Sequence, residues 1–506
     1  MNIIHLALKN DDEIKEYLSQ NEDEDIEDLE ISDEKKTEKI LITEKEKEEN
    51  EREEEDEEKK KLIKEEYRNF ISKLFGPIEA GSIRGSIFNM IILSLGSGLL
   101  SLPKYIQKTS LLMSIFLIIG IGILVWWSML LISKVCEKNN NYVYSRLIRN
   151  LYGPFLSNFY DCLVILYSIG VLILNQVIIL KLIGEAIFNL YYFKQYNNLE
   201  EFNNDINFWG NWKFKYLLPF TIGFLIIYPL CLIKDVSKLR IVSLFGIITL
   251  FGLIILLVIQ TKSYINYYNK NIYVPNDEKT HYNIYKINKG FDSDLYFFQF
   301  CSSLFFAYCS TIGAVPIFNT LKNNVRRRMY KVIRRSIITN IFIFITVVIS
   351  GYFTCPINTP DLIIQRKKII NGPDYLMSIG RLALSFTIIM KLPSNYASLR
   401  ITIFDKIWNN TEISNRKNII VTFITIFFCY TISVLYIKIS DYIKILGGVC
   451  STLVGFLFPA MLITRTNNRE RYHWKNVGTI FIFLLLTLIG FISSGKTIYD
   501  IFIGKH

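Results

Sequence analysis

The chain has few of the residues that catalytic and metal sites need. It contains 4 histidines among 506 residues, and they lie far apart in the sequence. Its 8 cysteines form no C-x-x-C pair and lie mostly in or beside apolar runs, as small buried side chains do. The sequence also lacks paired histidines, a nucleophile motif and a glycine-rich phosphate loop. We therefore expect no enzyme, no metal site, no disulfide framework and no cofactor.

A cleavable signal peptide is also lacking, because the first ten residues run directly into acidic sequence. Residues 1–60 carry 25 acidic and 10 basic side chains, a net charge of −15. This segment has too few apolar side chains to offset the conformational entropy that it would lose on folding. We predict an acidic disordered cytosolic tail over residues 1–66 and a transmembrane domain over residues 67–506. The tail either only solvates the chain or docks a cytosolic partner.

Long apolar runs dominate the rest of the chain. Hydrophobic residues make up 51% of the sequence and aromatic residues 14%, and a helix needs roughly 20 apolar residues to cross a bilayer. The pattern predicts an all-α polytopic membrane protein, surrounded by membrane lipid, with about 11 transmembrane helices. The predicted spans are residues 85–107, 110–134, 156–190, 215–233, 240–261, 294–320, 332–354, 375–396, 418–437, 442–464 and 475–495.

Basic charge lies in alternate connections between these spans. Residues 61–506 carry a net charge of +26. This charge alternates with the predicted spans, as basic residues that set membrane topology do. A nucleic-acid binder would gather it on one face, so no nucleic-acid partner is expected. The N-terminus is predicted to be cytosolic, and the sequon at Asn409 to be cytosolic and unused. The basic connections are Lys134–Arg149, Lys234–Arg240, Lys322–Arg335, Arg400–Lys417 and Arg465–Lys475.

Two predicted spans are interrupted at their centres. The first contains Gly96–Gly98 followed by Pro103, and the sixth contains Ser310–Pro316. Glycine weakens a helix by about 1 kcal/mol, and in lipid the freed backbone groups must find partners or line a cavity. Close helix packing through small residues is the alternative explanation. Breaks in spans one and six of eleven favour two five-helix inverted repeats plus one helix, with a site at the midplane.

At these residues the sequence resembles the amino acid/auxin permease family of the APC superfamily. Gly96-Ser97-Gly98-Leu99-Leu100-Ser101-Leu102-Pro103 is similar to the family's first-helix motif N-x-x-x-G-x-G-[IL]-L-x-[LI]-P. Ala307–Phe318 resembles the sixth-helix motif, and Arg381, Pro393 and Arg400 stand in the places of the eighth-helix arginines and proline. The likeness covers about residues 80–495. It implies a 5+5 inverted-repeat fold with broken helices 1 and 6, and amino acid transport by alternating access.

The resemblance also implies a substrate site between the first and sixth helices. Main-chain N–H groups at Gly96–Leu100 would hold the amino acid's carboxylate, and groups around Tyr308–Ser310 its amine. Phe305, Phe306 and Tyr308 would select the side chain by size and stacking. The predicted substrate-binding residues are Gly96, Ser97, Gly98, Leu99, Leu100, Phe306, Ala307, Tyr308, Cys309 and Ser310.

Departures from the family concern the coupling ion. Sodium-coupled members resembling system A/N carry an asparagine where this chain has Ile92 and a hydroxyl where it has Ile389. Isoleucine offers sodium no oxygen ligand, so proton coupling or exchange is expected, although Ser94, Ser86 and backbone carbonyls remain candidate ligands. Lys391, inside the eighth span, is a candidate tethered cation or proton carrier. The alternative is that it snorkels or pairs with a neighbouring helix.

Other polar residues in the spans carry weaker predictions. Lys181 and Glu185, four residues apart, are expected to pair. Arg381 and Arg400 are expected to mark the two ends of the eighth helix. Tyr167 and Asn175 either face the central cavity or hold helices together.

Two functions remain open at this point. One is a secondary carrier of amino acids in a plasma membrane or in a vacuole-like or lysosome-like membrane. The other is an amino acid sensor that signals through its acidic tail. A channel is disfavoured because no span carries a repeated polar pattern.

Overall fold

The computed structural model describes residues 79, 81–95, 97–192, 217–234, 239–271, 294–355, 359–366, 375–408, 414–434, 439–466 and 474–503. The chain divides into two units after Pro77, and every described residue belongs to the second, Ile78–His506. The predicted tail, Gly96 and the sequon at Asn409 lie outside the described residues. Within them, the regular structure is helical, without a strand.

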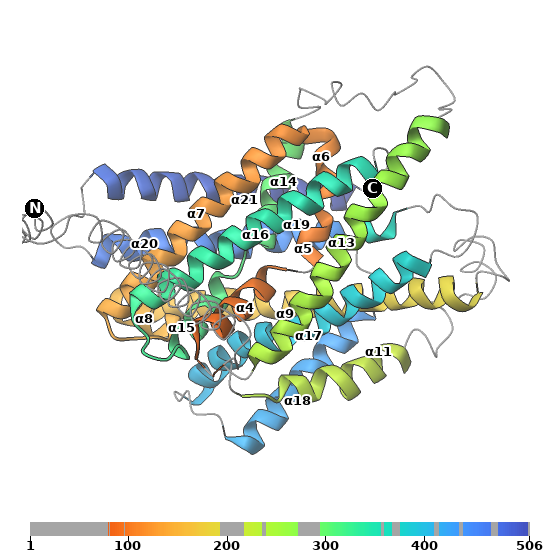
Figure 1. Ribbon diagram of the computed structural model, residues 1–506. Coiled ribbons are helices and arrows are strands. Elements are labelled where there is room, and N and C mark those ends of the chain that lie inside the picture. The colour runs from red at the N-terminus through yellow and green to blue at the C-terminus, as the bar shows by residue number, and fades with distance from the viewer. Residues whose placement is uncertain are drawn as a thin grey trace, which may run out of the picture. The chain divides into compact units, whose positions relative to one another are not determined.

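The colours of Figure 1 follow the order of the helices along the chain. The label η is used here for π-helical segments and for the 3-10 turn η6. They are α4 (Ile83–Ser94), α5 (Ser97–Ser101), α6 (Pro103–Thr109), α7 (Leu111–Lys138), α8 (Tyr144–Tyr152), α9 (Pro154–Ile187), η1 (Phe188–Tyr192), α11 (Leu218–Thr221), η3 (Ile222–Ile227), α12 (Tyr228–Cys231), α13 (Leu239–Asn271), α14 (Asp294–Ala307), α15 (Thr311–Asn319), α16 (Arg326–Thr354), η6 (Ile363–Gln365), α17 (Tyr375–Trp408), α18 (Asn415–Ser433), α19 (Ile439–Ile445), η7 (Leu446–Ser451), η8 (Leu453–Leu457), α20 (Phe458–Thr466) and α21 (Trp474–Ile503).

Eight helices of the described chain are long and apolar enough to cross a membrane, and the bent first helix makes nine. The other two predicted spans correspond to Leu218–Cys231, which is short, and to α18, which begins with polar residues. The count of eleven therefore stays a prediction. The boundary that differs most is the end of the eighth span, which was expected at residue 396, whereas α17 continues through Pro393 to Trp408. The fifth and eleventh helices also run past their expected ends, to Asn271 and Ile503. The polar residues after Pro393 end the apolar run but not the helix, because many of them are buried against other helices.

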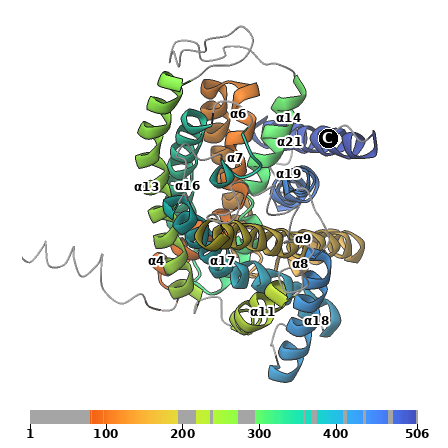
Figure 2. The ribbon, with the colours of Figure 1, turned by 90° about the vertical axis from the view of Figure 1, so that its right-hand side faces the viewer.

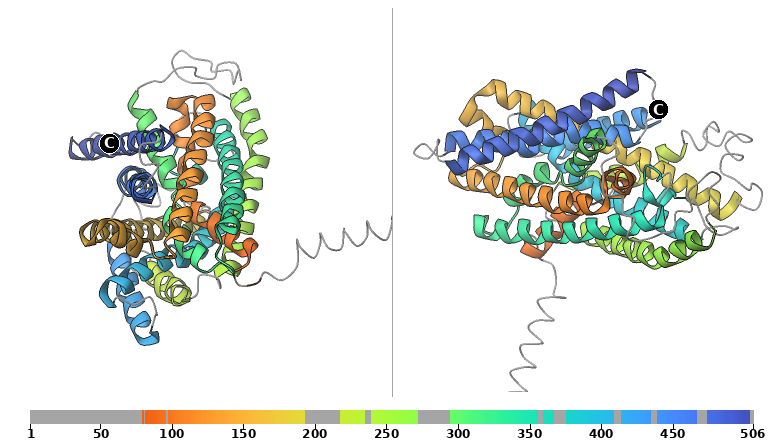
Figure 3. Two further views of the ribbon diagram at one scale, coloured as in Figure 1. Left: turned by 90° about the vertical axis from the view of Figure 1, so that its left-hand side faces the viewer. Right: turned by 90° about the horizontal axis from the view of Figure 1, so that it is seen from above.

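Burial separates central helices from helices that face lipid. In the most apolar 18-residue windows of α9 and of α14–α15, 83% of the residues are buried inside the protein. The corresponding share is 39% in α7, α13 and α21, whose outer faces carry exposed apolar side chains such as Leu112 and Phe116. Figures 2 and 3 show α13 and α16 running side by side at one flank of this unit. A site built on α9, α14 and α15 is thus shielded from lipid.

The helix contacts repeat between the two halves. The first broken helix packs through α4 on α13 and α16, the fifth and seventh spans. The sixth packs through α14 on η7 and α7, the tenth and second spans. These pairs correspond when each half is counted as five helices, and α9 and α17, the third helices of the halves, pack on each other. This is the inverted-repeat arrangement that the sequence predicts.

Candidate functional site

Both predicted helix breaks are confirmed. In the first span α4 ends at Ser94, Leu95 is extended (φ −84°, ψ 144°), and α5 begins at Ser97. The two parts of this span, Ile83–Ser94 and Gly98–Ile106, differ in direction by 41°. In the sixth span α14 ends at Ala307 and α15 begins at Thr311.

The two breaks meet through small residues. A methyl group added at Gly98 of α5 would lie 2.9 Å from the Cα atom of Ala307 and 2.9 Å from Cδ1 of Phe306. A methyl group added at Gly313 of α15 would clash with the side chain of Leu93 on α4. Each half of one broken helix thus packs on one half of the other. Close packing through small residues is therefore present at both breaks, and the use of the freed backbone groups as a site stays a prediction.

Four helices contribute side chains around Cys309, in the break of the sixth span. Tyr167 of α9 is hydrogen-bonded through its hydroxyl to the Cys309 thiol and to Ser451 of η7. The ring of Tyr167 also lies 6.2 Å from that of Phe306, measured between centroids. Lys391 of α17 lies within electrostatic range of Cys309. Tyr167 and Lys391 thus lie near the sixth-helix break, and the roles expected for them stay predictions.

A cavity of about 320 Å³, here called the vestibule, opens among three of the same helical spans. Its walls come from α8, α9, α15 and α17, with Lys234. The Tyr144 hydroxyl has no hydrogen-bond partner among the described residues. Burial raises the pKa of Tyr144 well above its ordinary value, so the hydroxyl stays protonated and can donate a hydrogen bond. The lining residues are Tyr142, Val143, Tyr144, Ser145, Tyr160, Val164, Lys234, Ile312, Val315, Pro316, Asn319, Thr320, Ser398, Ile401 and Thr402.

The vestibule wall leads to the cluster along three helices. Val164 precedes Tyr167 by three residues on α9, and Ile312 follows Cys309 by three residues in the sixth span. Ser398 follows Lys391 by seven residues on α17. Spacings of three, four and seven keep residues on one helix face. The cluster therefore lies within two turns of the vestibule wall along α9 and α17.

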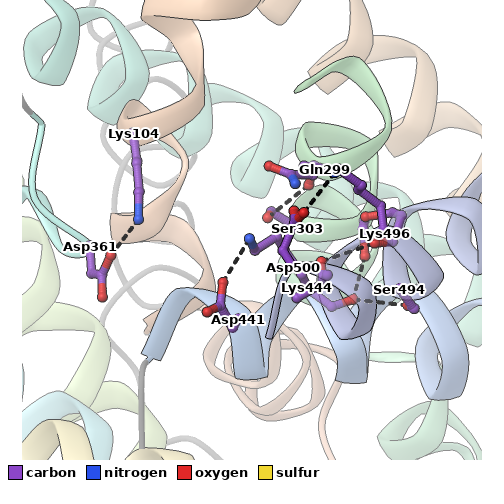
Figure 4. A network of polar contacts seen from close by, with 12 residues as sticks. Lys104, Gln299, Ser303, Asp361, Asp441, Lys444, Ser494, Lys496 and Asp500 are labelled. Atoms are coloured by element: carbon purple, nitrogen blue, oxygen red, sulfur yellow. Dashed lines mark hydrogen bonds and ion pairs between the residues drawn. The ribbon is translucent and has the colours of Figure 1, made fainter. Parts of the chain in front are cut away.

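A segment that sequence reasoning missed packs on α5 and α17. Leu362, Ile363 and Ile364, in the connection between α16 and α17, are fully buried, and we call residues 359–366 the plug. Lys104 of α6 pairs with Asp361 of the plug at 2.5 Å (Figure 4). The three apolar residues are the signal that could have revealed the plug, because solvent-exposed loops rarely carry such a run.

Further ties hold the plug to the transmembrane helices. Gln365 hydrogen-bonds Glu185 of α9. Arg366 donates to Gln260 of α13, and its guanidinium lies 4.0 Å from the ring centre of Tyr264. The vestibule and the plug thus lie at opposite ends of the central cluster.

The predicted selectivity residues point in different directions. Phe306 faces Tyr167, whereas Tyr308 is fully buried with its ring 4.6 Å from that of Phe344 on α16. The Tyr308 hydroxyl donates to the carbonyl of Ile118 on α7, at 3.0 Å. Phe305 packs on Phe456 of η8 with 5.4 Å between ring centroids. Of the three aromatic residues, the contacts favour Phe306 at the candidate site.

The remaining predicted site residues are buried as well. Leu99, Leu100, Ala307 and Ser310 are each no more than 2% exposed, and Ser94 keeps its hydroxyl without a hydrogen-bond partner among the described residues. Ser97 begins α5, and its side chain lies outside what the structure describes.

The apolar side chains at the expected sodium positions are tightly packed. Ile92 is fully buried, and its Cδ1 atom would lie 2.9 Å from a methyl group added at Gly246 of α13. Ile389 is 7% exposed. On the same helix, Thr387 donates to carbonyl oxygens, that of Ala383 at 2.9 Å and that of Gly246 at 3.2 Å.

The expectation for Arg400 needs correction. Arg400 does not mark an end of the eighth helix: it lies eight residues before Trp408 and is 1% exposed. It donates to the carbonyl oxygens of Cys231, Ile233 and Lys234 at 2.8–3.0 Å, where α12 ends. Such carbonyls have no partner within their own helix, so Arg400 caps α12.

The pairing of Glu185 was also missed. Its carboxylate lies 3.1 Å from Nε of Arg381 on α17, a partner from another helix that the i,i+4 spacing to Lys181 did not reveal. The pair joins α9 to α17 next to the plug residue Gln365.

The two broken helices, the repeated packing and the central cluster define a secondary transporter of the inverted-repeat class. The chain belongs to the transmembrane amino acid transporter protein family, whose model matches residues 79–501. It is therefore an amino acid transporter by family, which is not a class of enzymes, and it is a multi-pass membrane protein.

Named relatives agree with this family. AAT1 of Plasmodium falciparum (isolate 3D7), named as a candidate amino acid transporter, is 22% identical over 84% of this chain and 73% of its own length. Sodium-coupled neutral amino acid symporter 2 of Danio rerio is 22% identical over 80% of this chain and 79% of its own. The solved structure of MhsT in complex with L-phenylalanine covers 83% of this chain and all of its own, with a TM-score of 0.51 and 13% identity. That likeness concerns the fold alone.

Proposed function

We propose that this chain is a sodium-independent amino acid carrier that binds its substrate where the two broken helices cross. The proposed site comprises the backbone of the first break at Gly98–Leu100, the second break at Cys309, and the side chains of Tyr167 and Phe306. The observation that carries the proposal is the packing of Ile92 against Gly246, because this apolar contact occupies a place where sodium-coupled members offer oxygen ligands.

Rocking of one repeat against the other would move the substrate. The vestibule is the opening on one side of the cluster, and the plug closes the other side. With a cytosolic N-terminus, as the charge pattern predicts, this arrangement corresponds to an inward-open state of the carrier. The plug would then face the outside or the lumen of an acidic, vacuole-like compartment.

The test is uptake of labelled amino acids into proteoliposomes, first with an imposed proton gradient and then with a sodium gradient. We expect accumulation with the proton gradient, or exchange without either gradient, and no stimulation by sodium. Sodium-driven accumulation would refute sodium independence and leave the family unaffected. Absence of flux from folded protein would refute the carrier function.

A sensor acting through the acidic tail is the second candidate, and nothing in the family favours it. Deletion of residues 1–66 separates the two functions. A carrier keeps its flux after the deletion, whereas a sensor loses its cytosolic partner.

A further inference from the structure

Lys391 differs from the other buried cations of the described chain in its surroundings. Five basic side chains are classed as buried there, and four have polar partners. Arg381 pairs with Glu185, and Lys444 with Asp441 at 2.8 Å. Arg400 donates to carbonyls, and Arg366 to Gln260.

No hydrogen bond or ion pair is found for Lys391 among the described residues, although its side chain is only 6% exposed. Its electrostatic neighbour is the thiol of Cys309. One turn further along α17, the Ser394 hydroxyl also has no partner among the described residues. The position is therefore polar and not neutralised by this chain.

A cation held in a membrane span without an anion costs several kcal/mol. Proteins avoid that cost by pairing the charge, by releasing the proton, or by admitting an anionic ligand. The candidate site offers thiol and hydroxyl groups and no carboxylate among its described residues: Cys309, Tyr167 and Ser451 are its polar members. An anion that stabilises Lys391 would then come from the bound substrate.

The location of Lys391 allows this contact. It lies about 10.5 Å along the helix axis from Ser398 of the vestibule wall, since the two are seven residues apart and the rise is 1.5 Å per residue. Its neighbour Cys309 lies in the break at which the substrate is proposed to bind. A substrate bound at that break would thus approach Lys391.

We infer that Lys391 is a specificity-determining residue and that this carrier takes amino acids with an acidic side chain, the class of aspartate and glutamate. The α-ammonium and α-carboxylate groups of any amino acid cancel each other, so a neutral substrate brings no net charge. A side-chain carboxylate brings one negative charge, which pairs with Lys391 within the buried site. This inference rests on the proposed binding site.

The test compares glutamate with glutamine, which differ only in the side-chain group. Labelled uptake by the full chain in proteoliposomes is measured as kcat/KM for both, in the wild type and in Lys391→Met and Lys391→Arg. The control is Lys262→Met, which removes the same charge from an exposed position on α13.

We expect the wild type to prefer glutamate by about tenfold or more. In Lys391→Met, glutamate uptake should fall by roughly 30-fold, because one partner of a buried charge pair is gone, while glutamine uptake is kept or improved. Lys391→Arg should retain part of the preference, and Lys262→Met all of it. An equal glutamate-to-glutamine ratio in the wild type and Lys391→Met overturns the inference.

Should Lys391→Met fail to fold, thermal stabilisation of the wild type decides the question. Glutamate should raise its unfolding temperature more than glutamine at the same concentration, and the reverse order overturns the inference. Uptake of neutral amino acids alone would also overturn it while leaving the proposed carrier intact. Uptake of no amino acid would overturn the carrier itself.

Discussion

Gly98 and Ala307 bring the two broken helices together at the centre of the protein. A methyl group added at Gly98 would lie 2.9 Å from the Cα atom of Ala307, far inside the 3.5–4.0 Å at which carbon atoms pack favourably. The obstacle is backbone, which cannot rotate away as a side chain can. The crossing of α5 and α14 therefore requires glycine at residue 98.

We predict that Gly98→Ala lowers amino acid uptake by about tenfold or more, because α5 and α14 must separate and the candidate site is distorted. Uptake into proteoliposomes and the elution profile of the purified protein measure function and folding separately. Gly120→Ala on α7 is the matched control, since no atom lies within 4 Å of the added methyl group. Equal uptake by the two variants would contradict the requirement.

The second crossing predicts a rescue. An added methyl group at Gly313 would meet the tip of the Leu93 side chain and not backbone. Gly313→Ala should therefore reduce unfolding temperature and uptake, and Leu93→Ala in the same chain should restore part of both. Residues in contact usually couple by about 0.5–3 kcal/mol. Additive losses in the double variant would show that the two residues act independently.

The positions of the two helix breaks can be predicted from the local sequence. Gly96–Gly98 and Ser310–Pro316 interrupt apolar runs, so the positions of both breaks follow from the pattern alone, and the order of the spans suggests that they meet. The contact between Gly98 and Ala307 does not follow from it, because it depends on how α5 and α14 approach.

Side-chain directions were the least predictable feature. Tyr308 looked like a substrate contact, yet its hydroxyl bonds the Ile118 carbonyl on α7, a partner 190 residues away in sequence. The role of Arg400 could not be predicted for a similar reason, because its acceptors lie at the end of α12, far away in the sequence. In addition, the polar residues after Pro393 suggested that the eighth helix ends before Arg400.

The Arg400 cap yields a prediction about stability. Arg400→Met should lower the unfolding temperature, because it removes the donor of three carbonyl oxygens, that of the buried Cys231 and those of the half-buried Ile233 and Lys234, at about 1 kcal/mol each. Arg400→Lys should recover little, since a single ammonium cannot reproduce the planar fork of donors. Thermal unfolding in detergent measures both variants. Arg416→Met on α18, where the side chain is exposed, is the control and should change the temperature little.

The last prediction concerns the plug. The Lys104–Asp361 pair joins α6 to residues 359–366, and both side chains are less than one third exposed, so the pair contributes more than a fully hydrated one would. Replacement of either charge should loosen the buried residues Leu362–Ile364 and change uptake. If the plug closes one side of the transport path, Lys104→Glu and Asp361→Lys should each lower uptake, and together they should restore it, with a coupling of about 1 kcal/mol or roughly fivefold.

The chain offers a matched control for this charge reversal. Lys496 and Asp500 form a pair of similar length, 2.6 Å, and similar exposure, but both lie on α21 (Figure 4). Reversal of those two charges, singly or together, alters only one helix surface and should leave uptake within about twofold, since such i,i+4 pairs contribute about 0.3–0.5 kcal/mol. Should the two pairs respond alike, the effect at Lys104 would reflect surface charge in general, and the plug would lose its assigned role in closing the path.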